Sequence, residues 1–359
     1  MPLADLRNRL LRNPRFRAFA GRVWPFRYIA RRQARRLFDI SAGFVYSQVL
    51  MSCVRLGWFE ALADGPRALD ELASEGRLSD AAVRRLARAA HSLDLTEARG
   101  REHIALGSLG AAMVGDAGIA AMAAHHEVLY ADLHDPLALL RGEKKAGLSD
   151  YWGYAGSESA ERLQRESVAA YSRLMAASQP MIAEQVLDAY DFSGHRHLLD
   201  VGGGTGAFLD AVHGRFPHLQ RSLFDLPGVL AAREAPPGAL HLHPGSFVDD
   251  ALPQGADLIS LVRIIHDHDD DRVLTLLQRV REALAPGGTL LIAEPLAGTR
   301  GARAVGDAYF GFYLLAMGTG MARTVAEIDV LLAEAGFTPA KRHSTAIPLI
   351  CSVLTAVAK

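Results

Sequence analysis

The sequence predicts an α/β protein, with a doubly wound, Rossmann-like sheet in its C-terminal half and a helical, winged-helix-like domain before it. Strand-like apolar runs alternate with helical patterns from residue 195 onward. A glycine turn, Asp200–Gly206, joins the first of these runs to a helix that begins at Ala207. Short helices followed by a β-wing between residues 68 and 109 predict the smaller domain. A chain of 359 residues is long enough for both cores.

The composition is that of an ordinary soluble protein. Half of the residues are hydrophobic and the formal net charge is -1. The two cysteines, Cys53 and Cys351, cannot form a disulfide framework, which favours a reducing compartment. The sequence shows no uninterrupted apolar stretch of about 18 residues and no signal-peptide pattern. We therefore expect a cytoplasmic protein.

Residues 1–36 form a basic, aromatic arm. Asp5 is its single acid, against the arginines Arg7, Arg9, Arg12, Arg15, Arg17, Arg22, Arg27, Arg31, Arg32, Arg35 and Arg36. Aromatic residues such as Phe16 and Trp24 lie between them. This mixture fits peripheral contact with an anionic membrane surface. A loosely packed arm and nucleic-acid binding are the alternatives.

Residues 37–118 predict the winged-helix-like domain. Ser41–Leu56 and Asp80–Ala89 have helical spacing, and Leu93–Leu109 looks like the wing. Such a module serves either to read DNA or to dimerise. Acids offset the arginines between residues 60 and 101, so a strong basic face is not expected. Dimerisation is favoured, and we expect a homodimer that does not bind nucleic acid.

Residues 119–190 are predicted to be a helical connector that lines the substrate pocket. The aromatic residues of Tyr151–Tyr154 fit the wall of a ligand cavity, and packing within a core explains them equally well.

Residues 191–359 predict the doubly wound sheet. The expected strands are His197–Val201, Arg221–Phe224, Leu240–His243, Asp257–Val262 and Thr289–Ala293, with a closing hairpin from Thr338–Ser344 and Cys351–Ala356. The expected helices are Ala207–Arg215, Asp271–Leu284 ending at Pro286-Gly287-Gly288, and Val325–Ala335 ending at Gly336.

The glycine turn indicates the cofactor. Asp200 ends the first strand, and Gly202 and Gly204 allow the backbone to turn sharply beside a ligand. The turn has a carboxylate and no lysine, so a cationic ligand suits it better than a phosphate. S-adenosylmethionine, with its sulfonium and ammonium groups, is such a ligand.

Further candidates follow the next strands, at the edge where ligands of such sheets bind. Asp225, followed by Leu226, is placed to hold the ribose hydroxyls of a cofactor. The alternative is that Asp225 is simply a solvent-exposed acid in a loop, as most such residues are. Ser246 and Phe247 could flank an adenine, with Phe247 stacking on it.

His266 follows the fourth strand, where a methyl donor would present its methyl group. A neutral imidazole there can accept the proton of a hydroxyl. Asp267 and Glu294 are the two carboxylates that could orient it. A metal site is the weaker alternative, because capping of the next helix explains the acids Asp269–Asp271.

These motifs together resemble the O-methyltransferase family that includes plant caffeic acid methyltransferases and acetylserotonin methyltransferase. The match runs from about Phe44 to the C-terminus and includes the glycine turn, Phe224–Pro227, Arg263–Asp267, Pro286-Gly287-Gly288 and Arg323-Thr324. It implies a metal-independent homodimer that uses S-adenosylmethionine. His266 would be the general base, Asp225 the ribose ligand and Arg263 a cofactor contact. Met175 and Gln179 would line the cofactor and substrate pocket.

Within this family, the chain is most similar to the branch that methylates hydroxyneurosporene-type carotenoids. Ser47–Leu50, His125–Tyr130 and Leu140-Arg141-Gly142 carry that likeness. It implies a lipophilic acceptor with a tertiary hydroxyl group, and an enzyme that contacts the inner or photosynthetic membrane peripherally. Two departures from the plant enzymes stand out: Ser246 replaces an adenine-contacting aspartate, and Ala322 replaces a glutamate.

Two rival functions differ from carotenoid methylation. One is methylation of a soluble phenolic, polyketide or porphyrin-type hydroxyl by the same fold. The other is a winged-helix regulator in which the cofactor domain acts as a sensor.

Overall fold

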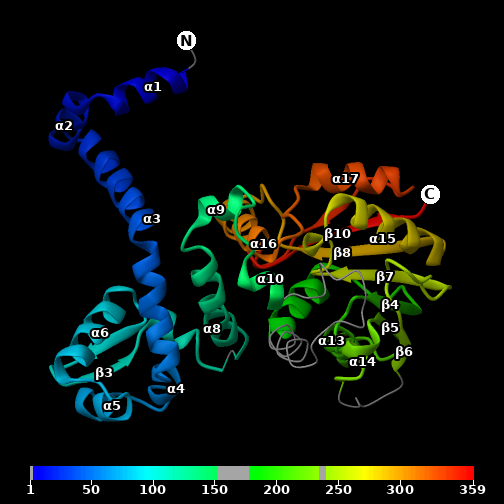
Figure 1. Ribbon diagram of the computed structural model, residues 1–359, viewed down its shortest axis with the longest axis horizontal. Coiled ribbons are helices and arrows are strands. Elements are labelled where there is room, and N and C mark those ends of the chain that lie inside the picture. The colour runs from blue at the N-terminus through cyan, green and yellow to red at the C-terminus, as the bar shows by residue number, and fades with distance from the viewer. Residues whose placement is uncertain (1–2, 116, 152–177, 234–239) are drawn as a thin grey trace. The chain divides into compact units, whose positions relative to one another are not determined.

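The computed structural model describes residues 3–115, 117–151, 178–233 and 240–359. The chain divides into two compact units, Met1–Asp116 and Ala117–Lys359 (Figure 1). The domain boundaries expected from the sequence at residues 36, 118 and 190 stay predictions. Met175 and the Trp152–Tyr154 aromatics lie outside the described residues.

The N-terminal arm is helical. Its helices are α1 (Leu3–Arg12), α2 (Pro14–Arg22) and the start of α3 (Phe26–Arg55). Asn13 explains the break between α1 and α2, since its side chain accepts hydrogen bonds from the backbone N–H groups of Arg15 and Phe16. The boundary expected at residue 36 falls inside α3, which continues without interruption into the next domain.

The rest of the first unit is the predicted winged helix. Its elements are α4 (Trp58–Ala61), β1 (Arg67–Ala68), α5 (Leu69–Glu75), α6 (Asp80–Ser92), β2 (Thr96–Arg99), β3 (His103–Leu106) and α7 (Ser108–Ala111). The strands form an antiparallel sheet in the order β1-β3-β2. Arg84 on α6 pairs with Asp80 and Glu102, so its charge is offset where a DNA-reading helix would need it.

The second unit is built around a seven-stranded sheet of order β6-β5-β4-β7-β8-β10-β9. Its strands are β4 (His197–Val201), β5 (Gln220–Asp225), β6 (Leu240–Pro244), β7 (Ala256–Val262), β8 (Leu284–Glu294), β9 (Lys341–His343) and β10 (Ser352–Val357). Strands β6, β5, β4, β7 and β8 pair in parallel, and β10 is antiparallel to both of its neighbours, β8 and β9. The chain order reverses between β4 and β7, which makes their carboxyl ends the switch point where ligands bind in such sheets.

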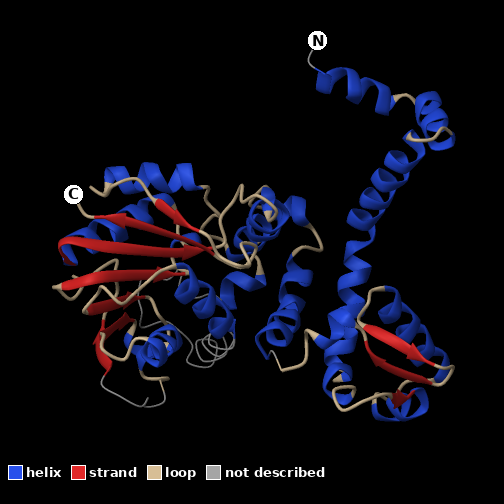
Figure 2. Cartoon of the chain, turned by 180° about the vertical axis from the view of Figure 1, so that it is seen from behind, coloured by secondary structure: helices blue, strands red, loops and turns tan. Residues whose placement is uncertain are grey.

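Helices cover both faces of this sheet (Figure 1). They are α13 (Ala207–Arg215), α14 (Pro227–Leu230), α15 (Asp270–Ala283), α17 (Val325–Glu334) and the helical residues 178–189. The connecting elements are α8 (Ala117–Asp132), α9 (Pro136–Leu140), α10 (Gly147–Tyr151), η2 (Ile265–Asp267), η3 (Ala304–Phe310) and α16 (Gly311–Met317). Figure 2 shows the same sheet from behind, coloured by secondary structure.

The predicted strands and helices are confirmed, with one correction. Residues 284–288, expected at the end of a helix, begin strand β8 instead. Leu284 pairs with Ala256 of β7, and the register then shifts before Thr289 pairs with Leu258. The strand thus includes the Pro-Gly-Gly turn, whose residues form an irregularity between two stretches paired with β7, where the helical pattern suggested a loop.

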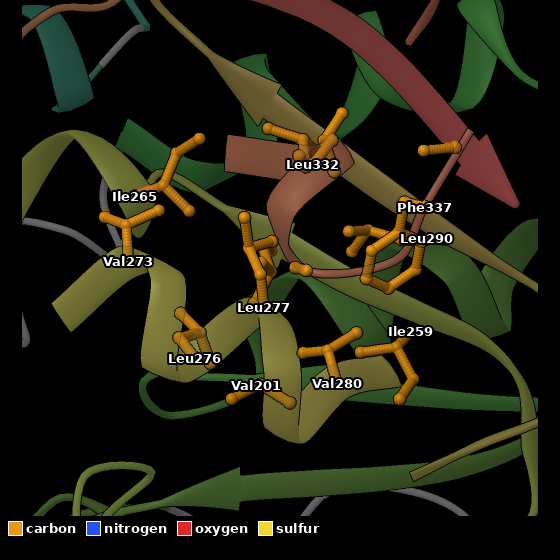
Figure 3. Close-up of a cluster of buried hydrophobic side chains, with 14 of the residues drawn as sticks. Val201, Ile259, Ile265, Val273, Leu276, Leu277, Val280, Leu290, Leu332 and Phe337 are labelled. Atoms are coloured by element: carbon orange, nitrogen blue, oxygen red, sulfur yellow. The ribbon is translucent and has the colours of Figure 1, made fainter. Parts of the chain in front are cut away.

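Alternate residues of the inner strands β5, β4, β7, β8 and β10 enter two separate cores. Leu199 of β4 packs with α15 and α17 on one face, and Leu198 packs with α13 on the other. Figure 3 shows the first of these cores, in which Leu277 of α15 lies among Val273, Val280 and Leu290. This alternation is what a strand covered on both faces requires.

Leu277→Ala will lower the free energy of unfolding of the second unit by about 2–5 kcal/mol, because the side chain is fully buried and leaves a cavity. Chemical denaturation measures this loss. Val330→Ala on α17, where the side chain is 65% exposed, is the control and will change stability by less than about 0.5 kcal/mol. Equal losses in the two variants would contradict the packing described.

Candidate active site

Asp200 lies at the carboxyl end of β4 and is fully buried. Its Oδ1 accepts a hydrogen bond of 2.5 Å from the hydroxyl of Ser260 on β7. Its Oδ2 is also buried but accepts no hydrogen bond from any described residue. This oxygen points at the glycine turn, since a Cβ on Gly203 would lie 2.1 Å from it. The turn therefore holds a buried acceptor that has capacity for a donor from a ligand.

Asp225 ends the neighbouring strand β5 and binds the same turn. Its Oδ2 accepts the backbone N–H of Gly204 at 2.7 Å, and its Oδ1 accepts the N–H of Leu226 at 2.7 Å. Gly204 has a φ of +63°, which suits glycine. The sequence-predicted Asp200, Gly202, Gly204, Asp225 and Leu226 are thus brought together at one edge of the sheet.

Burial dominates the ionisation of these two carboxyl groups. It raises the pKa of Asp200 to about 7, although the hydrogen bond from Ser260 opposes the rise and Asp225 adds to it. Burial likewise raises the pKa of Asp225 to about 6, against the backbone N–H groups of Leu226 and Gly204. Such groups ionise more readily once a cation or a hydroxyl donor binds beside them.

Ser246 and Phe247 follow β6 as expected. The Ser246 hydroxyl accepts the N–H of Val248 at 3.2 Å, so it stabilises its own turn. The ring of Phe247 lies edge-on to His268, with centroids 5.2 Å apart. His268 follows β7, so these rings connect the loops after two strands.

His266 lies in η2, after β7, and is 7% exposed. Its Nδ1 bonds to Oε2 of Glu294, at the end of β8. The other oxygen of Glu294 accepts the backbone N–H groups of Ile264 and Ile265, both at 2.8 Å. One carboxylate therefore fixes both the imidazole ring and the turn that carries it.

Asp267 approaches the other ring nitrogen. Its Oδ1 lies 3.0 Å from Nε2 of His266, but this oxygen accepts no well-directed hydrogen bond from a described residue. Burial alone would lower the pKa of His266, but the charges of Asp267 and Glu294 outweigh it and raise that pKa to about 10. These two carboxylates therefore favour the protonated ring in the ligand-free protein, and the neutral imidazole that general-base catalysis requires stays a prediction.

Arg263 lies just before this turn, with a left-handed φ of +60°. Such a backbone is strained for a residue with a side chain and is common at functional sites. Its Nη1 donates to the Ser178 hydroxyl at 2.9 Å, which places Gln179, the neighbour of Ser178, on the adjoining helix. Met175 is outside the described residues.

Arg323 is a positioning residue whose role sequence reasoning missed. Its guanidinium is almost fully buried and donates to the backbone oxygen of Ile265 at 2.5 Å and of His268 at 2.7 Å. It also bonds to Asp270 at 2.8 Å. It thus fixes the loop that carries His266. These contacts join segments far apart in the chain, so Arg323-Thr324, although part of the family resemblance, did not indicate them.

The acids after His266 have structural partners. Asp269 is the N-cap residue of α15, yet its Oδ1 accepts the N–H of Gly320 rather than capping the helix. Asp270 pairs with Arg323, and Asp271 lies in the first turn of α15. These contacts account for Asp269 and Asp270 without a metal ion.

An aromatic contact to His266 was also missed. The ring of Phe310, at the end of η3, meets the His266 ring with centroids 5.9 Å apart and an angle of 68° between their planes. Ala322, where the plant enzymes resembled have a glutamate, packs partly buried against the apolar cluster that includes Phe310. Glu294 and Asp267 are the carboxylates that the described structure places against His266.

Two family models match the chain. An O-methyltransferase domain matches residues 130–338, and an O-methyltransferase dimerisation domain matches residues 38–107. The first covers more than half of the chain.

Curated relatives cover nearly the whole chain. Demethylspheroidene O-methyltransferase of Cereibacter sphaeroides is 43% identical over 99% of this chain and 95% of its own length. The protein of the same name from Rhodobacter capsulatus is 41% identical over 91% of this chain and 83% of its own.

The fold matches solved structures as well. The crystal structure of human N-acetylserotonin methyltransferase in complex with S-adenosylmethionine superposes with a TM-score of 0.76 and 26% identity, covering 91% of this chain and 97% of that one. The site geometry, the family models and these relatives agree. The chain belongs to the O-methyltransferase family and carries that family's dimerisation domain.

Proposed function

We propose that this enzyme methylates the tertiary hydroxyl group of a demethylspheroidene-type carotenoid, with S-adenosylmethionine as the methyl donor. The observation that carries the acceptor is the identity of 43% over 99% of the chain to a demethylspheroidene O-methyltransferase. The apolar, aromatic surroundings of His266, with Phe310 against its ring, fit a lipophilic acceptor.

The residues of the glycine turn fit S-adenosylmethionine. The unsatisfied Oδ2 of Asp200 suits the ammonium group, and the remaining lone pairs of Asp225 suit the ribose hydroxyls. The ring of Phe247 suits the adenine, while Arg263, Leu226, Ser246 and Gln179 would border the site. When bound, the cofactor supplies a methyl group on a cationic sulfur, which is an activated electrophile.

His266, Asp267 and Glu294 would remove the proton. A tertiary alcohol is a much weaker acid than a phenol, whose pKa is about 10, so ionisation before methyl transfer is not required of them. Asp267 and Glu294 lie against the two ring nitrogens of His266, so the three side chains would share the proton that the oxygen loses. They would take it up once the oxygen has begun to form its new bond to the methyl carbon. Alignment of the dry acceptor would contribute most of the acceleration.

The test uses the full-length protein and cofactor labelled in its methyl group. Demethylspheroidene in detergent micelles is one acceptor and a catechol is the other. Transfer of label to the carotenoid, identified as a methyl ether, is the expected result. Transfer to the catechol alone would replace the proposal with a soluble phenolic acceptor. No transfer to either acceptor would also contradict it.

Cofactor affinity will rise with pH between about pH 5 and pH 8, and binding will release protons. Burial raises the pKa of Asp200 to about 7 and that of Asp225 to about 6, so both are partly protonated in the free protein at mildly acidic pH. A bound cation favours their charged forms. Calorimetry in two buffers of different ionisation enthalpy measures the released protons. An affinity independent of pH would contradict these assignments.

We also propose that the arm, residues 1–36, binds an anionic membrane surface and so brings the enzyme to its acceptor. Trp24 is 78% exposed and Tyr28 is 70% exposed, next to the arginines of α2 and α3. Each basic residue near such a surface contributes about 1 kcal/mol. One helix among the described residues, α3, also has the length and apolar composition to cross a membrane. The match to the dimerisation domain begins at residue 38, within α3. The apolar C-terminal half of α3 is therefore more readily explained as part of that domain than as a membrane span.

Co-sedimentation with vesicles tests this second proposal. The protein will bind vesicles that contain phosphatidylglycerol, will bind neutral vesicles weakly, and will be released by salt. Replacing Arg31, Arg32, Arg35 and Arg36 by glutamine will weaken this binding. Equal binding to neutral vesicles, or no effect of the replacements, would overturn it.

A further inference from the structure

Two histidine–tyrosine pairs join α8 to the segment formed by η3 and α16. His126 Nε2 lies 2.6 Å from the Tyr309 hydroxyl, and His125 Nε2 lies 2.9 Å from the Tyr313 hydroxyl. The two tyrosine rings stack, with centroids 5.8 Å apart and 25° between their planes. The pairs have the same chemistry and differ in their surroundings.

The His125–Tyr313 pair is part of a core. Tyr313 is 6% exposed and packs with Leu129, Leu148 and Met317. Tyr309 is only partly buried, at the margin of this cluster. Core packing therefore explains the His125–Tyr313 pair, but it does not explain the His126–Tyr309 pair.

Ring contacts lead from Tyr309 to His266. Tyr309 meets Phe310 edge-on, with centroids 5.1 Å apart, and Phe310 in turn meets His266 at 5.9 Å. Burial raises the pKa of Tyr309 to about 12, and the positive charge of Arg263 opposes this rise. Tyr309 is therefore close to the end of β7, although it belongs to a different part of the chain.

The backbone that carries these rings is unusual. Segment η3, Ala304–Phe310, is a π-helix, and it ends at the residue that contacts His266. π-Helical turns are rare, but they occur frequently at functional sites. Here the π-helix sets where Tyr309 and Phe310 lie relative to His266.

We propose that Tyr309, fixed by His126, is a positioning residue for the acceptor, and that Tyr309 and Phe310 form the wall along which the acceptor's apolar chain lies beside His266. This inference rests on the carotenoid acceptor of the proposed function. The flat faces and edges of aromatic rings pack well against a conjugated chain. The Tyr309 hydroxyl retains hydrogen-bonding capacity after its bond to His126, whichever tautomer the histidine adopts.

Tyr309→Phe in the full-length protein tests the inference. It will raise the KM for demethylspheroidene about three- to tenfold, as expected for one lost hydrogen bond, and leave the KM for S-adenosylmethionine unchanged. His126→Phe will have the same effect, and the double variant will be no worse than either single one. Titration of the carotenoid absorption band with protein and S-adenosylhomocysteine will show the same weakening without turnover.

Tyr313→Phe is the matched control, since it removes the same atom from the sister pair. It will lower the melting temperature and leave the acceptor KM unchanged. An unchanged acceptor KM in Tyr309→Phe, or an equal rise in Tyr313→Phe, overturns the inference while leaving the proposed function intact. If the unmodified protein does not methylate demethylspheroidene, the proposed function and this inference both fail.

Discussion

His266→Ala will reduce kcat by about 10²- to 10⁴-fold, which is the usual contribution of a positioned acid–base group. The ring is held by Glu294 through Nδ1 and lies 3.0 Å from Asp267 through Nε2, so no other described side chain can take its place between them. Its removal leaves the carboxyl groups of Asp267 and Glu294 without the ring that lies between them. Steady-state kinetics with saturating cofactor measure the loss.

The dissociation constant for S-adenosylmethionine will stay close to that of the unmodified protein, because His266 is not part of the glycine turn. His343→Ala is the control. His343 lies on β9, at the far edge of the same sheet, and bonds to the Thr355 hydroxyl at 2.8 Å. A His266→Ala enzyme with full activity would remove His266 from the mechanism.

Asp225→Asn will weaken cofactor binding by about 10- to 100-fold, as expected when hydrogen bonds to a charged group worth about 1.5–3 kcal/mol are lost. The carboxylate holds the N–H groups of Gly204 and Leu226, so the substitution also loosens the glycine turn. Isothermal calorimetry with S-adenosylhomocysteine measures the effect without turnover.

Asp257→Asn is the matched control for this substitution. Asp257 also binds backbone N–H groups, those of Arg196 and His197, but at the amino end of β4, opposite the switch point. Its replacement will lower stability and leave the cofactor affinity unchanged. An equal loss of affinity in both variants would mean that the sheet, and not the Asp225 carboxylate, determines cofactor binding.

The sequence was sufficient for the parts of the site that depend on local pattern. Strand β4 and helix α13 begin and end at the predicted residues, because apolar runs and glycine turns act within a few residues. Asp200 and Asp225 could be placed together because parallel strands end at one edge of a sheet. The positions of those two carboxylates could therefore be predicted from the order of the strands alone.

Contacts between distant segments could not be predicted in the same way. Arg323 reaches the His266 loop from more than 50 residues away, and Tyr309 meets a histidine on α8. The direction of the pKa shift of His266 could not be predicted either, since it depends on the distances of two carboxylates and not on their presence in the sequence. Similarly, the sequence could not show that the Pro-Gly-Gly turn belongs to strand β8, because this depends on the pairing of Leu284 with Ala256 of β7.

The bonds of Glu294 also have a consequence for local opening of the structure. This side chain belongs to β8, which lies between β7 and β10 in the middle of the sheet, and it accepts the amide protons of Ile264 and Ile265. Those amides lie in a turn, where hydrogen exchange with solvent is usually fast. Here they should exchange more slowly than turn amides without a partner, because their release requires the buried Glu294 side chain to leave both the backbone and the His266 ring. The loop that carries the acid–base group would then open only together with the end of β8.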